Sequence, residues 1–558
     1  MNPLDTFHAS SSTFTEGNLK VSEAGGNAKY TQVGNFGMSS GKWYFEFCGV
    51  NSDNTWMLGI GDVTKGLDRG YTGSAGDGLF VYVDGDKYAP TSASSYGVSW
   101  THGDVMGVAV DMDNNAMYFA KNNTWMDSGV PTSGSTKTGA AYTTELVGKT
   151  WVAAMGRGST NNTITATFNF GQDSSFAGAK TAQGNQDGND KGDFYYTPPS
   201  GFLALCTDNL DSPSIADPTA HFNTAIWSGN DTYPRTIDVG FDPGLVWGKS
   251  RTDSGTDHYL LDSVRTFANG KALSSNATNA EGVKAANVNI NGTTSTGFTM
   301  AATSGYDTQN KSGQTYVAWN WKAGGTASSN GDGTITSSVS ANTTAGFSIV
   351  SYTGTGANAT VGHGLSQTPE LIIVKSRDSA EAWNVYAEPV SADPATDYLI
   401  LNTTAAVADD DRFWNDTAPT SSVFTVGSYD GTNKSGDDFI AYCWHSVPGF
   451  SKIAKFDGTS LADGPFLQTG FAPAMVMIKM IEPHNYEWLI FDNQRPGYNV
   501  VSKKLVPNAT DAEGTGTYVD FLSNGIKLRD NSYNNNHSSS SYLFIAFAES
   551  PQKFSNAR

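Results

Sequence analysis

The sequence is poor in cysteine and in charge, and it lacks long apolar runs. Its only cysteines, Cys48, Cys206 and Cys443, lie far apart and within apolar stretches, which predicts buried free thiols and argues against a disulfide framework. No stretch of about 18 apolar residues occurs, so we expect no membrane-spanning helix. The start, MNPLDTFHASSSTF, has neither the basic nor the apolar region of a signal peptide. We therefore expect synthesis in the cytoplasm, with any extracellular role reached as part of a particle.

Basic residues are also scarce. There are 34 of them against 54 acidic residues, which gives a net charge of −20. Such a surface repels phosphate, so we expect no nucleic-acid partner and no membrane insertion. What is abundant is glycine, with 61 residues, and aromatic residues, at 12%. This composition is too aromatic for a disordered chain and is typical of short strands joined by polar turns, so an all-β fold in several domains is predicted.

Two phrases recur three times after residue 240. FDPGLVWGKSR, LSQTPELIIVKSR and GFAPAMVMIKM each contain an apolar run that closes on a lysine, at Lys249, Lys375 and Lys479. Each is followed downstream by a second shared phrase: SGQTYVAWNWK, SGDDFIAYCWH and SSSYLFIAFAE. The repeat has the length of a domain, not of a solenoid unit. We therefore predict three tandem related β-sandwich modules at 201–325, 326–448 and 449–558.

The N-terminal part carries a different set of strand patterns. KWYFEF (42–47), WMLGIGD (56–62), the hairpin GDVMGVAVDMDNNAMYFAKNN (103–123) and the closing FNFGQ (168–172) follow one another in order. Together they resemble the SPRY domain. The resemblance implies a concanavalin-like two-sheet β-sandwich over residues 1–176 that recognises ligands through loops at one edge, without catalysis. The polar stretch 177–200 is predicted to be a linker.

FYYTPPSGFLALCTDNL (194–210) and the repeats after it resemble tail-fibre-like structural proteins of marine tailed bacteriophages. This resemblance implies a virion protein, a tail fibre or surface appendage, that adheres to a host-surface glycan or protein. It also implies other virion proteins as partners and a homo-oligomer, with a trimer expected. Two alternatives stay open: a capsid decoration or vertex protein without a receptor role, and a glycan depolymerase tailspike.

Catalytic and metal-binding patterns do not assemble. Glycoside cleavage needs two carboxylates held across one bond, whereas the candidate glutamates have no acidic partner at a recurring place. We therefore predict no enzyme and no cofactor. Asp111, Asp113 and Asn115 alternate as the oxygens of a calcium loop do, but the loop lacks the later glycine and glutamate of an EF-hand. No metal site is expected, and these three residues come nearest to one.

Binding residues are sought among aromatic side chains beside Asn or Asp, because sugar sites pair an aromatic face with hydroxyl partners. Aromatic residues in loops that break the repeat pattern are preferred, since a shared scaffold keeps its core and varies its loops. The candidates are Tyr533 with Asn534, Asn535 and Asn536, then Trp414 with Asp416, Trp125, Trp56 and Tyr71.

Overall fold

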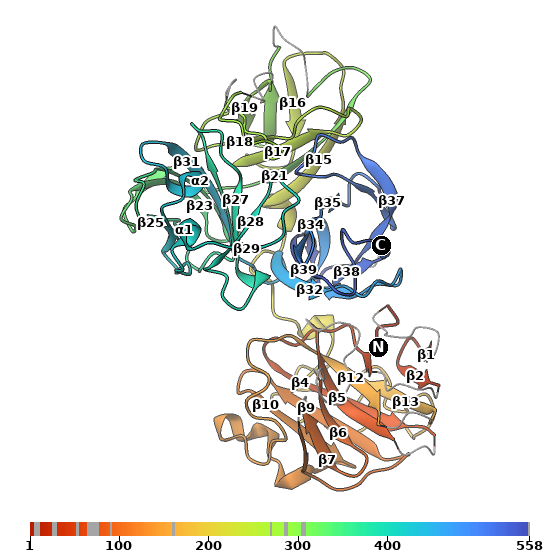
Figure 1. Cartoon of the computed structure of the whole chain (residues 1–558). Coiled ribbons are helices and arrows are strands. Elements are labelled where there is room, and N and C mark those ends of the chain that lie inside the picture. The colour runs from red at the N-terminus through yellow and green to blue at the C-terminus, as the bar shows by residue number, and fades with distance from the viewer. Residues whose placement is uncertain are drawn as a thin grey trace. The chain divides into compact units, whose positions relative to one another are not determined.

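The computed structural model describes residues 1–4, 12–24, 31–51, 55–63, 78–89, 92–158, 162–267, 271–283, 288–302 and 309–555. The chain forms two compact units, Met1–Asp211 with Pro465–Gln468, and Ser212–Gly464 with Thr469–Arg558. Nearly all regular structure is β, as predicted (Figure 1). The helices are short: α1 (Asp411–Trp414), α2 (Asp430–Asn433), and the 3-10 turns η1 (Met126–Ser128), η2 (Pro131–Thr136), η3 (Thr207–Asn209), η4 (Pro218–Ala220) and η5 (Glu388–Val390). Within the described residues, no helix has the length and apolar character needed to cross a membrane.

Two facing sheets build the first unit. One has the order β1 (Ser12–Thr15), β2 (Lys20–Glu23), β13 (Ile164–Asn169), β4 (Lys42–Gly49), β9 (Val105–Asp111), β10 (Ala116–Lys121) and β11 (Thr124–Trp125), with β14 (Leu203–Ala204) parallel to β4. The other has the order β3 (Thr31–Val33), β12 (Trp151–Arg157), β5 (Trp56–Asp62), β6 (Gly78–Tyr82), β7 (Asp86–Ala89) and β8 (Ser92–Ser95). Trp43, Phe45 and Phe47, which alternate along β4, lie in the core between the sheets. The period-two strand prediction is confirmed there.

The predicted linker is packed against this sandwich. Phe194 and Phe202 are fully buried beside Tyr44 on the outer face of β4. Glu46 on the same face accepts hydrogen bonds from the backbone N–H groups of Tyr195 (2.8 Å) and Tyr196 (2.7 Å). Residues 177–211 thus belong to the first unit, and the first repeat begins about ten residues later than predicted. The few aromatic residues at the end of the polar stretch are enough to bury it, because β4 presents apolar side chains on both faces.

The second unit contains the three predicted copies, here taken as 212–325, 326–448 and 449–558. Their main sheets share one strand order. In the first copy the order is β15 (Phe222–Ser228), β21 (Thr315–Trp321), β17 (Leu245–Ser250) and β18 (Tyr259–Asp262). In the second it is β24 (Phe347–Thr353), β31 (Asp438–Trp444), β26 (Leu371–Ser376) and β27 (Asn384–Ala387), extended by β22 (Ser328–Asn330), β23 (Ser337–Asn342), β28 (Asp397–Ile400) and β29 (Ala408–Asp409). In the third it is β32 (Ser451–Asp457), β39 (Ser541–Pro551), β34 (Phe471–Glu482) and β35 (Trp488–Asp492).

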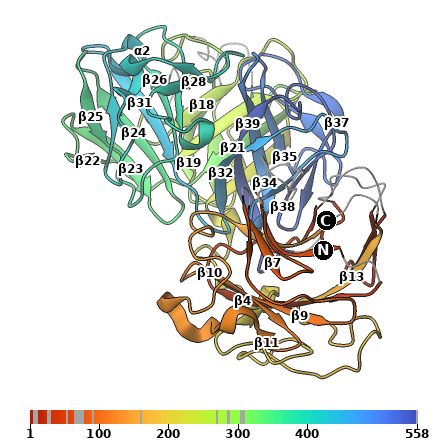
Figure 2. The same ribbon diagram turned by 60° about the horizontal axis from the view of Figure 1, so that its bottom comes forward.

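A smaller sheet belongs to each copy. These sheets are β16 (Arg235–Asp238), β20 (Gly297–Met300) and β19 (Ile290–Thr294); β25 (Ala359–Gly362) and β30 (Val423–Val426); and β38 (Gly525–Leu528), β37 (Gly514–Leu522) and β36 (Val501–Lys504). β33 (Phe466–Gln468) lies in the segment grouped with the first unit. The prediction of three related β-modules is confirmed by the common strand order. Figure 2 shows β24, β31 and β26 of the second copy and β32, β39 and β34 of the third.

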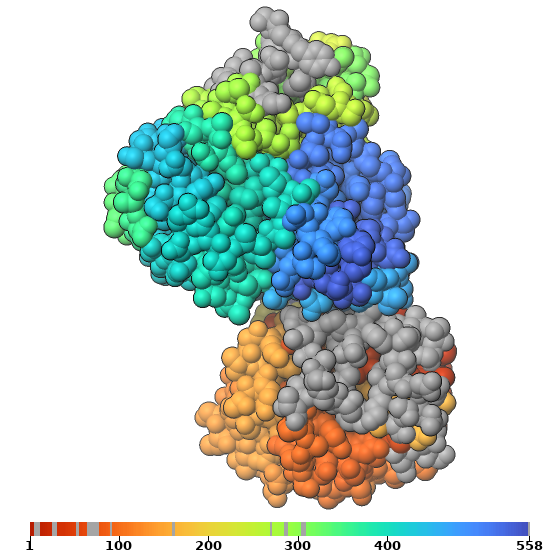
Figure 3. All heavy atoms as spheres, in the orientation of Figure 1, coloured from red at the N-terminus to blue at the C-terminus, as the bar shows by residue number. Residues whose placement is uncertain are grey.

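The copies are not separate domains, because their main sheets enclose one core. A single apolar cluster contains side chains from the three equivalent central strands. They are Val317 and Trp319, Ile440 and Tyr442, and Leu543 and Ile545. The alternate residues of the same strands, such as Ala318 and Ala441, point into each copy's own sandwich. Each main sheet is therefore buried on both faces, which explains why these strands read as continuous apolar runs. In Figure 3 the teal second copy and the blue third copy adjoin over a broad surface.

Equivalent side chains join each copy to the next in a ring. One buried ring nitrogen from each copy meets a backbone carbonyl of its neighbour. The pairs are His258 Nε2 and Val506 O (3.1 Å), Trp383 Nε1 and Ser274 O (2.8 Å), and Trp488 Nε1 and Ile400 O (3.1 Å).

A second set of contacts has the same cyclic order. At two junctions an arginine pairs with a glutamate, Arg377 with Glu281 (2.8 Å) and Arg251 with Glu513 (2.9 Å). At the third junction Ile481 and Val407 take the places of the arginine and the glutamate. The Val407 N–H donates to Ile481 O (2.9 Å), and the glutamate N–H donates to the arginine carbonyl in the same way at the two ionic junctions. The second unit is thus a closed pseudo-threefold body with two ionic junctions and one apolar junction.

The three lysines that end the repeated phrase are completely buried. Lys249 and Lys375 donate to carbonyls of their own copy, and Lys479 donates to Tyr486 O (2.7 Å) and to Thr404 O of the second copy (2.9 Å). Burial lowers the pKa of each ammonium group to about 8. These lysines are structural ties, which is why they recur.

Candidate functional site

A polar hollow lies at one end of the main sheet of the third copy. Three adjacent strands meet there: β32 ends at Asp457, β34 ends at Glu482 and β39 begins at Ser541. The hollow has a volume of about 290 Å³ and is lined by Asp457, Glu482, Pro483 and Ser538–Ser541. Ser541 Oγ donates to Asp457 Oδ1 (2.6 Å). Both carboxylates are exposed to solvent, so they can accept hydrogen bonds from a ligand.

Aromatic rings stand beside this hollow on the segments that continue from it. Tyr533 stacks on His537 with ring centroids 3.7 Å apart, and Tyr486 lies nearly parallel to Tyr533 at 5.3 Å. His484 meets Tyr533 edge to face at 6.0 Å and is exposed. Tyr533 keeps 41% of its surface exposed in spite of these contacts. The four rings and the hollow are named the Tyr533 face below.

The aromatic residues of the Tyr533 face differ from the residues at the equivalent positions of the second copy. The backbone of Gly354 in the second copy closely approaches Lys434 O, and Gly458 in the third copy approaches His537 O in the same way. This places His537 where the second copy has Lys434, and Tyr533 where it has the exposed Asp430. An aromatic pair therefore replaces an acid and a base on an otherwise shared loop. Tyr533 is thus a loop aromatic outside the repeat pattern, and its role as a ligand contact stays a prediction.

Of the three asparagines predicted to bind ligand, Asn536 stabilises the loop instead. Asn536 is fully buried, and its Oδ1 accepts the Thr459 N–H (2.7 Å). In the second copy Asn433 does the same with Thr355 (2.8 Å), because the loop after the first main strand needs this bond. Asn535 is also fully buried. Asn534 is half-buried and remains a candidate.

Two of the predicted tryptophans are core residues. Trp56 is completely buried on β5 and stacks on Trp100 at 5.9 Å. Trp414 is 2% exposed in α1 and donates from Nε1 to Asp397 O (3.1 Å). Their polar neighbours in the sequence do not matter, because the polypeptide turns these indoles inward. Neither can present a face to a ligand, and the prediction for both is wrong.

The remaining candidates are divided. Trp125 is half-buried at the end of the β10–β11 hairpin, edge to face with Tyr118 at 6.5 Å. Asp416 is exposed just after α1, in a left-handed turn with Asn415. These two stay predictions, and both lie outside the Tyr533 face. Tyr71 lies outside the described residues.

The calcium candidates stabilise a hairpin turn. Asp111 is buried in an ion pair with Lys42 (3.0 Å) and accepts from the Asn114 N–H (2.9 Å). Asp113 Oδ1 accepts from the Gly41 N–H (2.7 Å), and Asn115 Oδ1 from the Leu146 N–H (2.9 Å). Their oxygens thus point to separate partners and do not converge. Among the described residues, no group of three or more His, Cys, Asp or Glu side chains could hold a metal ion.

Sequence reasoning missed His484, Tyr486 and His537, and also the carboxylates of the hollow. The signal for His537 was present as a histidine in place of the lysine of the NKSG turn in the other copies. His484 and Tyr486 lie between β34 and β35, and nothing in the sequence indicates that this turn approaches Tyr533. Tyr498 was missed as well: it is 85% exposed in the loop after β35, away from the Tyr533 face along that strand.

Comparisons with known proteins agree with the two-unit architecture. A family model described as SPRY domain matches residues 42–155, which confirms the predicted N-terminal fold. Crystal structures of the SPRY domain of human HERC1 and of a human SPRY domain are similar. Each is 16% identical over 28% of this chain, with 91% and 94% of those chains covered and TM-scores of 0.24 and 0.22.

No curated protein matches the chain. A second family model, described as a domain of unknown function (DUF7483), matches residues 217–551. Its range coincides closely with the three-copy unit and covers more than half of the sequence. The chain therefore belongs to the DUF7483 family and carries a SPRY domain ahead of that domain.

Proposed function

We propose that the chain is a non-enzymatic adhesin of a tailed bacteriophage virion, a tail fibre or surface appendage, that binds a host-surface glycan through the Tyr533 face. The observation that carries this proposal is the exposed aromatic stack beside a hollow of carboxylates and hydroxyls. It occurs in only one of two otherwise matching loops, the one in the third copy. A feature that the repeat does not need for folding is best explained by a ligand.

The chemistry of the face suits a sugar. A pyranose ring has an apolar side formed by C–H groups, which packs against aromatic rings such as Tyr533 and His484. Its hydroxyls need acceptors and donors within hydrogen-bond reach. Asp457 and Glu482 supply acceptors, and the hydroxyl groups of Ser538–Ser541 can serve as either.

Binding without cleavage fits this site better than depolymerisation. A glycosidase needs one carboxylic acid that stays protonated in an apolar niche. Asp457 and Glu482 are both exposed, and the hollow around them is lined by four serines and a single apolar residue, Pro483. The arrangement supports recognition of hydroxyls.

The virion assignment rests on the sequence resemblance to tail-fibre-like proteins, and the closed three-copy body is consistent with it. A rigid body with three interlocked sheets holds its loop tips in fixed positions, and several copies of a weak site on one particle raise the overall affinity through avidity. A homo-oligomer, such as the expected trimer, would supply that multiplicity together with other virion proteins.

The test is binding of the purified full-length protein to an array of bacterial surface glycans and to host cells. Tyr533→Asp installs the residue of the second copy, so the loop is expected to keep its fold. Loss of the ring should weaken binding about tenfold. Tyr498→Asp removes another exposed tyrosine of the same copy and should leave binding unchanged.

Competition between the purified protein and infecting phage separates the alternatives. An adhesin blocks infection, and its Tyr533→Asp variant does not. Binding to empty capsids without binding to cells would instead establish the decoration protein. Release of reducing ends from a bound glycan would overturn the non-enzymatic assignment, and equal losses in the two tyrosine variants would overturn the site.

A further inference from the structure

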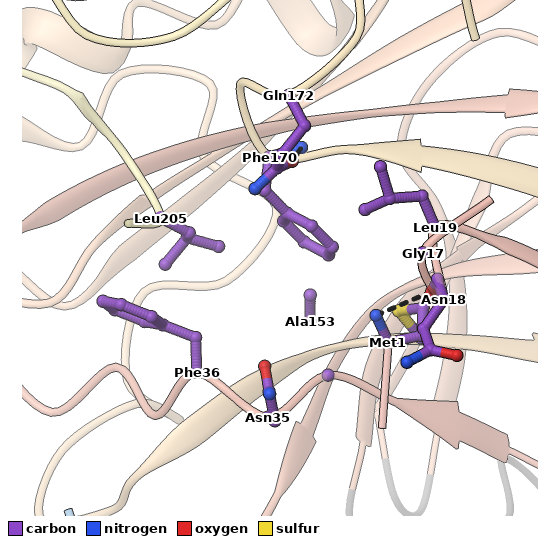
Figure 4. A pocket seen from close by; sticks show the side chains of 11 residues that line it. Met1, Gly17, Asn18, Leu19, Asn35, Phe36, Ala153, Phe170, Gln172 and Leu205 are labelled. Atoms are coloured by element: carbon purple, nitrogen blue, oxygen red, sulfur yellow. Dashed lines mark hydrogen bonds between the residues drawn. The ribbon is translucent and has the colours of Figure 1, made fainter. Parts of the chain in front are cut away.

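A separate cavity lies in the first unit, at the edge where its two sheets meet. Its volume is about 370 Å³, within the range of small-molecule sites. Segments distant in the sequence line it: Met1, the β1–β2 turn (17–19), the segment after β3 (34–36), Ala153 of β12, Phe170 and Gln172 after β13, and Leu205 after β14. Figure 4 shows Phe36, Leu205, Phe170 and Leu19 around the hollow.

Most of the cavity lining lies outside the residues that the SPRY family model matches. The SPRY match covers residues 42–155, and of the lining residues only Ala153 falls within it. Leu205 comes from the stretch that packs on the sandwich through Glu46. That stretch therefore provides one wall of the cavity in addition to covering the sheet.

The lining selects the class of ligand. Two phenyl rings, Phe36 and Phe170, offer apolar faces, and three amide side chains, Asn18, Asn35 and Gln172, offer hydrogen-bonding groups. None of the lining residues that the structure describes has a charged side chain. The amino group of Met1 donates to Asn18 O (2.9 Å), and burial lowers its pKa to about 6, so it is mostly uncharged at neutral pH. An ionic ligand would lose its hydration there without gaining a counter-charge, whereas a neutral hydroxylated ring matches both kinds of wall.

Gln172 is already oriented for such a ligand. Its Oε1 accepts the Phe170 backbone N–H (2.9 Å), which fixes the amide and leaves Nε2 to donate. Asn18 stands in the tight β1–β2 turn with a φ of 69°, and its side chain is exposed at the edge of the cavity. The Gln172 amide is therefore held by the backbone before any ligand arrives, which lowers the entropy cost of binding.

We propose that this cavity is a second binding site, which takes a neutral saccharide unit of one or two rings independently of the Tyr533 face. The site would let one chain hold a glycan at two points, one in each unit. The inference does not rest on the proposed function, because it uses only residues of the first unit.

The experiment is saturation-transfer NMR on the full-length protein with four probes: glucose, galactose, N-acetylglucosamine and lactose. Gln172→Glu keeps the acceptor for Phe170 and removes the donor, and Asn18→Gly removes the amide while tolerating the positive φ. Each should weaken binding of the responding sugar about fivefold, the worth of one hydrogen bond. Ala153→Leu should fill the cavity and abolish the signal.

Two controls keep the outcome decisive. Gln186→Glu adds the same charge at an exposed site outside the cavity and should change nothing. Tyr533→Asp should leave this signal intact, so failure of one site is distinguishable from failure of the other. If Ala153→Leu does not fold, the two polar variants decide. No signal from any of the four sugars, or a signal unchanged in both polar variants, overturns the proposal.

Discussion

Removal of one buried carboxylate should weaken the whole three-copy unit. Asp262 Oδ2 accepts from Arg265 Nε (2.6 Å) and from Tyr442 OH of the second copy (2.8 Å), and its Oδ1 accepts the Arg265 N–H (2.8 Å). The side chains of both ion-pair partners are fully buried. Asp262→Ala leaves the guanidinium buried without its main counter-charge. Such a loss costs about 3–5 kcal/mol.

The effect on thermal unfolding follows from the size of the unit. For roughly 340 residues, an unfolding entropy of about 2.1 cal/mol/K per residue converts this cost into a fall in Tm of about 4–7 °C. Differential scanning calorimetry of the full chain measures it. Asp242→Ala, an exposed aspartate in the same copy, should stay within about 0.5 kcal/mol of wild type.

The second copy suggests how to rescue the variant. The strand register equates Leu245 with Leu371, which places Ala387 and Val390 where the first copy has Asp262 and Arg265. The fold thus tolerates an apolar pair at this position. Asp262→Ala combined with Arg265→Met and Tyr442→Phe removes all three polar partners and should recover at least about 2 kcal/mol of the loss. A triple variant as unstable as the single one would refute this reasoning.

Three further predictions concern pH and the shared loop. Burial alone would raise the pKa of Glu281, but hydrogen bonds from Arg377 and Lys271 outweigh it and lower the pKa. The second unit should therefore lose stability as pH falls below about 4.5, and Glu281→Gln should flatten that limb in acid titrations followed by circular dichroism. Burial raises the pKa of Glu46 to about 7, so the first unit should lose about 3 kcal/mol between pH 4.5 and 7. Glu46→Gln should remove this slope in thermal melts, and a slope that persists would assign it to another group. Asn433→Ala breaks bonds to three backbone groups and should cost about 2–4 kcal/mol in denaturant unfolding. A loss below 1 kcal/mol would contradict its scaffold role.

The three repeated strands could be predicted from the sequence, but not every residue-to-residue match between the copies could. The phrases that end on Lys249, Lys375 and Lys479 do form equivalent strands, because a buried lysine tied to carbonyls constrains its neighbours. The lysines pair with Val317, Ile440 and Leu543 on the central strands. By this register Phe544 is equivalent to Ala318 and Ala441. The strand register is the same in the three copies, but an apolar run such as LFIAFA does not reveal which of its residues takes the place of those alanines.

The shared core could not be predicted for a related reason. A strand that is apolar on both faces is known to be buried, but its sequence does not say whether the second face meets its own module or another one. The contacts that decide this point, such as Trp383 Nε1 to Ser274 O, join residues more than a hundred positions apart. Local pattern identifies the strands and leaves their partners open.

Comparing the copies distinguishes residues that stabilise the shared fold from residues that are available to a ligand. Asn536 and Tyr533 are near neighbours and were equally plausible ligand contacts by residue type. The second copy repeats Asn536 as Asn433, with the same buried hydrogen bond, and replaces Tyr533 by the exposed Asp430. The asparagine hydrogen bond is common to both copies, whereas the tyrosine ring occurs in only one of them. The exposed ring leaves apolar surface in water, and the proposed glycan would offset that cost by covering it.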